Sequence, residues 1–126
     1  MSIELEDVRY DSKNKIIVLK GKIEPTVGEI KQAFNQVLEM CEIEKCNKVL
    51  VDGTNTKKLP SISEIYSLSL YMLTHIKKLL KIRIAYAISD EVSDRFRFFD
   101  TVITNRGGPI HKFNNLDDAK EWLVNK

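Results

Sequence analysis

The feature that most constrains the fold is a short apolar run, residues 48–52, in the middle of the chain. The run is too short for a helix, and Asn47 and Gly53, which favour turns, bound it. A run of this length and composition is typical of a central strand that is buried on both faces. Such a strand needs packing partners on both sides of its sheet, which favours an α/β fold.

The N-terminal part of the chain predicts a hairpin followed by a helix. Loose alternation over residues 3–10 and a stronger β-rich run over 15–23 flank a polar turn, as expected for two paired strands. Thr26 and Glu29 then have the spacing of a capping box. Apolar residues follow at helical spacing over residues 30–41, so we expect a helix there.

The C-terminal part continues the alternation of helix and strand. A second capping box, formed by Ser61 and Glu64, predicts a helix that continues to about residue 80. The remaining predicted elements are a strand at 82–88, a helix between Asp90 and Gly107, a strand at 109–113 and a helix at 115–123. Phe96 and Phe98 also alternate like a strand, but the helical pattern around them is longer.

These elements predict a single α/β domain over residues 1–126, in the order ββαβαβαβα. We expect a mixed, mainly parallel β-sheet with about four helices, in which the N-terminal hairpin is the antiparallel part. No linker, repeat or low-complexity tract interrupts the sequence. A chain of 126 residues, 43% of them hydrophobic, is long enough for one core.

Composition argues against several classes of function. The net charge is +2 and the charges are interspersed, so nucleic-acid binding is not expected. No apolar run could span a bilayer and the N-terminus lacks a secretory signal, so we expect no stable membrane insertion and a cytoplasmic location. Cys41 and Cys46 are expected to be reduced thiols. His75 and His111 lack partner ligands nearby in sequence, so neither a metal site nor a cofactor is predicted.

Three stretches carry a resemblance to a known family: residues 49–53, 97–107 and 113–123. With the predicted element order, they resemble the SpoIIAA-like branch of the STAS-like (anti-sigma-factor-antagonist-like) proteins. The resemblance covers nearly the whole chain. It implies a curved mixed sheet with helices packed on it, and a role in protein–protein switching or small-ligand binding without catalysis.

In the anti-sigma antagonists that name this fold, a phosphorylated serine at the start of the second helix controls docking to a partner. The resemblance places Ser61 at that position, with Ser63 close by, although the neighbouring Asp and Gly of the family motif are absent. A phosphate there would meet free N–H groups and the positive end of the helix dipole. Ordinary helix capping accounts for the same serine, so both interpretations stay open.

The second predicted helix carries more apolar residues than one core contact uses. They cover an arc of roughly 200°, against roughly 100° for an ordinary amphipathic helix. The surplus has three interpretations: a ligand pocket, a homodimer contact, or a contact beneath a neighbouring helix. Tyr71 points away from the arc, and its exposure would favour an interaction surface.

Two further candidates lie in the third predicted helix and the loop after it. Phe98 lies off the apolar face of this helix and close to Arg95 and Arg97 in sequence. This position makes it a candidate contact for a partner or an anion. A place at the periphery of the core explains it as well. Arg106 and the N–H groups around Gly107 could bind an anion, while helix termination alone explains the glycine.

Asp52, Gly53 and Thr54 follow the central strand, at the sheet edge where ligands of α/β proteins gather. A similar Asp-Gly-Thr occurs at the start of haloacid-dehalogenase-like phosphatases. Leu50 stands where those enzymes carry their nucleophilic aspartate, and the sequence shows no other catalytic constellation. A purely structural role at the end of a strand explains Asp52 better than catalysis does.

Three hypotheses of function follow. The first is a non-enzymatic regulatory or protein-interaction module that binds an unknown protein partner or a second copy of itself. Its surface would comprise Asp52, Thr54, Ser61 and Ser63. The second is a carrier or sensor of a small apolar or lipid-like molecule, with a cavity of roughly 300 Å³ or more. That cavity would be lined by Leu70, Leu73, Phe96 and Phe99. The third is a hydrolase that uses Asp52.

Overall fold

The structure is a computed structural model that describes residues 8–92, 97, 101 and 110–125. Five strands form one sheet in chain order: β1 (Val8–Asp11), β2 (Ile16–Lys20), β3 (Lys48–Gly53), β4 (Arg83–Ile88) and β5 (Ile110–Phe113). β1 and β2 are antiparallel, and the other three neighbouring pairs are parallel. The predicted α/β fold, with a mixed, mainly parallel sheet and an N-terminal hairpin, is confirmed.

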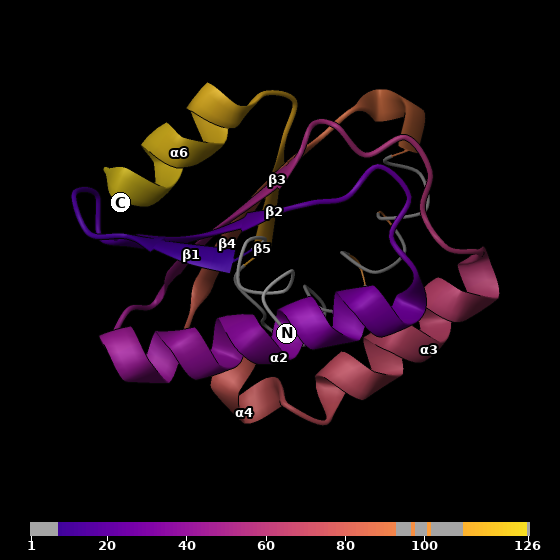
Figure 1. The fold of residues 1–126 in the computed structure, drawn as a ribbon, viewed down its shortest axis with the longest axis horizontal. Coiled ribbons are helices and arrows are strands. Elements are labelled where there is room, and N and C mark those ends of the chain that lie inside the picture. The colour runs from indigo at the N-terminus through magenta and orange to yellow at the C-terminus, as the bar shows by residue number, and fades with distance from the viewer. Residues whose placement is uncertain (1–7, 93–96, 98–100, 102–109, 126) are drawn as a thin grey trace.

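Helices cover both faces of this sheet. They are α2 (Val27–Glu44), α3 (Ile62–Leu73), α4 (Ile76–Leu79) and α6 (Leu116–Val124). α2, α3 and α4 lie on one face and α6 lies on the other (Figure 1). Because the strands are added in one direction and crossovers between parallel strands are right-handed, the connecting helices fall on the same face. α6 follows the last strand and is free to cover the opposite face.

The helix predicted between β4 and β5 lies mostly outside the described residues. Residues 90–92, 97 and 101 are helical, which agrees with the prediction at those positions. Phe96, Phe98, Phe99 and Arg106, the candidate residues of this region, are outside the described part. None of the helices that the structure describes is both long enough and apolar enough to cross a membrane.

The core has two parts, one on each face of the sheet. Val49 of β3 is 1% exposed and packs with Ile17 in the part beneath α2 and α3. Its neighbour Leu50, 3% exposed, packs with Ile16 and Leu123 in the part beneath α6. Consecutive residues of β3 are therefore buried on opposite faces, which explains the unbroken apolar run from Val49 to Val51.

Both predicted capping boxes are present. At the start of α2, Glu29 N–H donates to Thr26 Oγ1 (3.1 Å) and Thr26 N–H donates to Glu29 Oε1 (2.9 Å). α2 ends where Lys45 adopts a left-handed conformation with φ of 51° and Cys46 N–H donates to the Cys41 carbonyl (3.0 Å). These local bonds satisfy backbone groups that a helix terminus leaves without partners.

The second helix is shorter than the sequence predicted, because the chain turns between α3 and α4. Thr74 Oγ1 donates to the Tyr71 carbonyl (2.6 Å). Thr74 N–H donates to the same carbonyl (3.1 Å), and His75 N–H donates to the carbonyl of Met72 (2.9 Å). Each of these backbone bonds spans three residues instead of four, so the helix tightens and ends. The prediction of one continuous helix to about residue 80 was therefore wrong.

Replacement of Leu123 by alanine tests the packing of α6. Leu123 is fully buried against the sheet, so Leu123→Ala should lower the free energy of unfolding by about 3 kcal/mol, measured by urea denaturation. The matched control is Val124→Ala on the same helix, where the side chain is 37% exposed and the expected loss is below about 1 kcal/mol. Equal losses in the two variants would contradict this packing.

Candidate functional site

The turn after β3 holds two of the predicted site residues together. Thr54 donates to Asp52 Oδ1 through its N–H (3.1 Å) and through its hydroxyl (2.6 Å). Between them, Gly53 packs so closely against β4 that an added Cβ would lie 3.0 Å from the Ala87 carbonyl oxygen. The aspartate thus closes a tight turn at the carboxyl end of a central strand.

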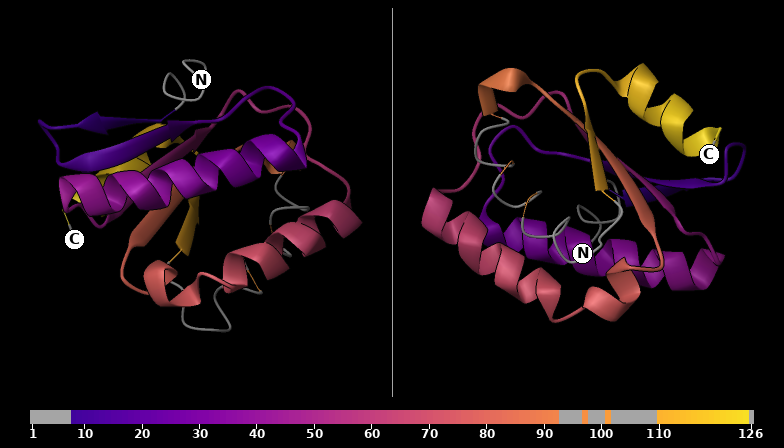
Figure 2. Two further views of the ribbon diagram at one scale, coloured as in Figure 1. Left: turned by 60° about the horizontal axis from the view of Figure 1, so that its bottom comes forward. Right: turned by 180° about the vertical axis from the view of Figure 1, so that it is seen from behind.

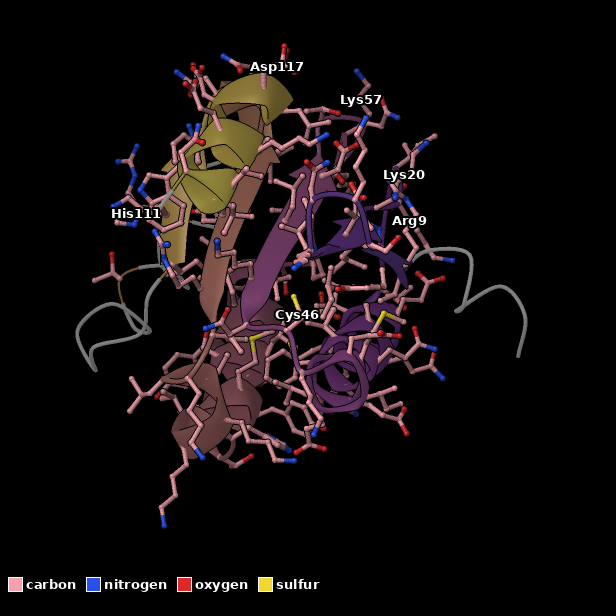
Figure 3. The ribbon with its side chains drawn as sticks, turned by 90° about the vertical axis from the view of Figure 1, so that its left-hand side faces the viewer. Arg9, Lys20, Cys46, Lys57, His111 and Asp117 are labelled. Atoms are coloured by element: carbon pink, nitrogen blue, oxygen red, sulfur yellow. The ribbon has the colours of Figure 1, made fainter. Side chains whose placement is uncertain are left out.

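The described partners of the Asp52 side chain are both groups of Thr54. Within the described residues, its side-chain hydrogen bonds go to Thr54 only, with no acid or base among them. The described part of the chain also contains no group of three or more His, Cys, Asp or Glu side chains placed to hold a metal ion. His111 lies beside α6 (Figure 3), where its ring stacks on Trp122 with a centroid distance of 4.7 Å.

The start of α3 brings together the two candidate phosphorylation sites. Ser61 Oγ accepts the N–H of Glu64 (3.3 Å), and Ser61 N–H donates to Glu64 Oε1 (2.9 Å). Ser63 Oγ lies 3.2 Å from Ser61 Oγ, and both serines are exposed. The hydrogen bond from the Ser61 backbone, aided by its hydroxyl, holds the pKa of Glu64 below the ordinary value of 4.5. Within the described residues, no hydrogen bond joins this pair to Asp52 or Thr54.

The outer side of α3 carries a stripe of exposed apolar residues. Ile62 is 64% exposed, Tyr66 49% and Leu70 48%. Their spacing of four residues places them on one side of the helix, which we call the α3 face. The buried residues of α3 are Ile65, Leu68, Ser69 and Met72. The wide apolar arc predicted from the sequence therefore divides into a buried part and an exposed part.

Tyr71 differs from its prediction. It is half-buried between α2 and α3, which lie side by side on the same face of the sheet (Figure 2). Its hydroxyl donates to Asn35 Oδ1 (2.8 Å), and its ring meets that of Phe34 edge-on at 6.2 Å. Lys31 Nζ lies 4.9 Å from the ring centroid. Tyr71 thus joins two helices and contributes little free surface.

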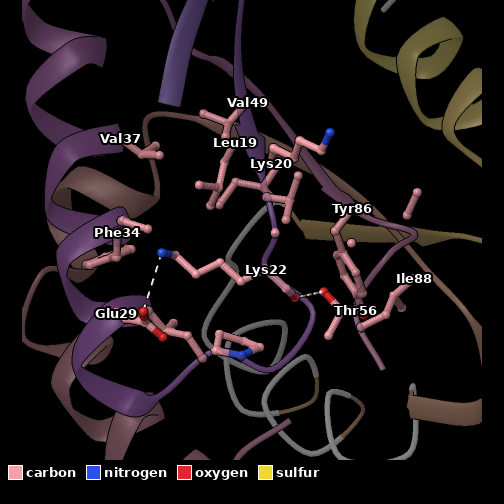
Figure 4. A pocket seen from close by; sticks show the side chains of 18 of the residues that line it. Leu19, Lys20, Lys22, Glu29, Phe34, Val37, Val49, Thr56, Tyr86 and Ile88 are labelled. Atoms are coloured by element: carbon pink, nitrogen blue, oxygen red, sulfur yellow. Dashed lines mark hydrogen bonds and ion pairs between the residues drawn. The ribbon is translucent and has the colours of Figure 1, made fainter. Parts of the chain in front are cut away.

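A cavity of about 160 Å³ lies between α2 and the sheet (Figure 4). Its lining includes Val49 and Tyr86 from the sheet, Phe34 and Val37 from α2, and Met72 from α3. Leu70 and Leu73, which the carrier hypothesis placed in the lining, do not line it: Leu70 is exposed, and Leu73 packs at the margin of the core. The cavity is also about half the size that this hypothesis predicted.

The residues of α2 that line this cavity were not predicted from the sequence. Ile30, Ala33 and Phe34 belong to the apolar face predicted for the helix, but periodicity shows only which side of a helix is buried. The small side chain of Ala33, in the middle of that face, was the available signal. Whether a neighbouring side chain fills the space beside an alanine depends on packing between distant segments.

Comparisons with known proteins assign no family to this chain. The chain matches no protein-family model. It likewise has no significant match among curated proteins or among solved structures. The structure therefore supports the resemblance noted in the sequence only at the level of the fold, which is a mixed five-stranded sheet with an N-terminal hairpin.

The cap of α3 can be tested by replacing each serine at its start. Ser61→Ala removes the oxygen that accepts the Glu64 N–H, so the free energy of unfolding should fall by about 1 kcal/mol. Ser63→Ala is the matched control, because within the described residues this hydroxyl contacts only the Ser61 hydroxyl, and its effect should stay below about 0.5 kcal/mol. Urea denaturation of the two variants measures both values. An equal effect of the two substitutions would contradict the capping geometry.

The pKa of Glu64 predicts a pH dependence for the same cap. Because the folded state lowers this pKa, ionised Glu64 stabilises the fold above its unfolded value of 4.5 and loses that effect as pH falls through the folded pKa. Glu64→Ala should therefore lower the free energy of unfolding at neutral pH. At about pH 3 the difference between this variant and the wild-type protein should be smaller. Urea denaturation at the two pH values checks this, and a difference that does not change with pH would contradict it.

Proposed function

We propose that this chain is a non-enzymatic regulatory module of the STAS-like type, which binds a partner protein through the α3 face. The observation that carries the proposal is the exposure of Ile62, Tyr66 and Leu70 along one side of α3. Large apolar side chains at this spacing are what an amphipathic helix presents when it docks into an apolar groove. The proposed partner therefore offers an apolar groove to α3.

The exposed stripe is more than scattered surface hydrophobicity. Single exposed apolar residues are common on proteins, whereas a contiguous patch favours an interaction site. Ile62, Tyr66 and Leu70 are each about half exposed or more, and they succeed one another along one helix. Aromatic residues are also enriched among those that dominate binding energies, which makes Tyr66 the proposed centre of the contact.

Phosphorylation is the proposed control of this contact. Ser61 and Ser63 flank Ile62, the first residue of the stripe, and both are exposed. A phosphate on either serine would place about two negative charges beside the apolar contact. Arginine or lysine side chains on the partner would then read the modification. The partner proposed here thus combines an apolar groove with a basic rim.

Several features support the STAS-like and non-enzymatic parts of the proposal. A serine at the start of the helix that follows β3 occupies the position that the family resemblance assigns to the regulatory serine. Asp52 closes a turn with Thr54, which is a structural role sufficient to explain it. Cys41 and Cys46 are free thiols, which suits the reducing cytoplasm that we propose as the site of action.

The alternative of a carrier or sensor of a small apolar or lipid-like molecule receives less support as the main function. A lipid-sized ligand needs a cavity of roughly 300 Å³ or more, and the cavity beside α2 has about 160 Å³. A hydrolase also receives less support, because the described residues place no acid or base in hydrogen-bonding contact with Asp52. The interaction module is the hypothesis that accounts for the exposed stripe of Ile62, Tyr66 and Leu70.

The proposal is tested with a partner captured through the α3 face. A photo-crosslinking residue at position 70, expressed in the protein's own host, identifies the partner, which is then purified and titrated with each variant. Leu70→Glu should weaken binding by about tenfold or more, because it places a charge in an apolar contact. Leu80→Glu is the matched control, since both leucines are 48% exposed, and it should change binding by less than about twofold.

The outcomes separate the hypotheses. Ser61→Asp should shift the affinity for the same partner while the protein remains folded by circular dichroism. Crosslinks from position 70 to the same chain would show a homodimer in place of a separate partner. Equal effects of Leu70→Glu and Leu80→Glu on the titration would overturn the assignment of the α3 face.

A further inference from the structure

We propose that the cavity between α2 and the sheet is a binding site for a small neutral apolar molecule, about as large as one aromatic ring. This inference is independent of the interaction proposed for the α3 face. It depends on the position of the cavity, the chemistry of its lining and its volume.

The cavity extends along most of the length of the parallel strands and reaches their carboxyl ends. Its lining extends along β3 from Val49 to Gly53 and along β4 from Ile84 to Ile88, so it reaches the ends of both strands. Ile30 and Ala33 of α2 form part of the opposite wall. Ligands of open α/β sheets bind outside these strand ends, because the connecting segments diverge there. One end of the cavity therefore reaches the region in which ligand sites of α/β folds are common.

The buried polar side chains in the described part of the lining already have partners. The hydroxyl of Thr56, which is 4% exposed, donates to the Lys22 carbonyl (2.7 Å). Lys22 Nζ lies 3.3 Å from Glu29 Oε2 (Figure 4), so these two lining residues of opposite charge pair with each other. Among the described residues, every buried side-chain nitrogen or oxygen has a hydrogen-bond partner.

This chemistry selects against charged ligands. A carboxylate inside the cavity would lose its water and gain no hydrogen bond, which is strongly unfavourable. A carboxylate beside Lys22 would compete with Glu29 for its ammonium group. A neutral apolar molecule gives up no hydrogen bonds by entering, and it exchanges water for aliphatic and aromatic side chains such as Ile30, Phe34 and Val49.

The volume sets the size of the ligand. The cavity measures about 160 Å³. An apolar cavity of about 150 Å³ engineered into another protein stays dry and binds benzene. Unfilled apolar space weakens packing, and a larger residue than Ala33 would fill this space without disturbing helix propensity. Occupation by a small apolar ligand restores the missing contacts.

The test uses benzene as the probe and benzoate as its charged counterpart. Benzene should raise the Tm of the wild-type protein in a saturable manner, and benzoate should not. Ala33→Leu fills part of the cavity and should weaken benzene binding by about tenfold or more. Gln32→Leu, an exposed position on the same helix, is the matched control and should bind benzene as the wild-type protein does.

A second measurement keeps the test decisive if Ala33→Leu does not fold. Nuclear Overhauser contacts from benzene to the methyl groups of Ile30, Val37 and Val49 in the wild-type protein would place the probe inside the cavity. The absence of these contacts at saturating benzene, or binding of benzoate as tight as that of benzene, would overturn the proposal. The α3 face is unchanged in these variants, so failure here leaves the partner-binding proposal standing.

Discussion

The burial of β3 on both faces is the constraint on which the rest of the structure depends. Val49 and Leu50 point to opposite sides of the sheet, and each is almost completely buried. One side needs α2 and α3 as a cover, and the other needs α6. The same arrangement leaves α3 with one side against the core and the other toward solvent, where Ile62, Tyr66 and Leu70 are exposed. The surface proposed for partner binding is therefore a consequence of how the central strand is covered.

Features set by local sequence were predictable. The capping boxes at Thr26 and Ser61 depend on side chains three residues away, and both are present. The mixed, mainly parallel sheet with its antiparallel hairpin follows from the alternation of elements. The turn between α3 and α4 was not predictable from apolar periodicity. It depends on hydrogen bonds of Thr74 and His75, and the spacing of apolar residues continues across it almost unchanged.

The candidate sites were less predictable than the fold, because they depend on contacts between segments far apart in sequence. The surplus of apolar residues on α3 was visible, but its division into buried and exposed parts required the position of α2. Tyr71 illustrates this, since its bond to Asn35 turns an expected surface residue into a contact between two helices. The cavity beside Ala33 likewise depends on how the sheet and α2 pack together.

The most direct test of the α3 face is hydroxyl-radical footprinting in living cells of the protein's own host, compared with the purified protein. Tyr66 and Leu70 should be protected in cells, because the partner covers them there. Ile43 and Leu80, exposed at 69% and 48%, lie outside the stripe and should react equally in both settings. Equal reactivity of Tyr66 and Leu70 in cells and in the purified protein would contradict the proposal that α3 binds a partner.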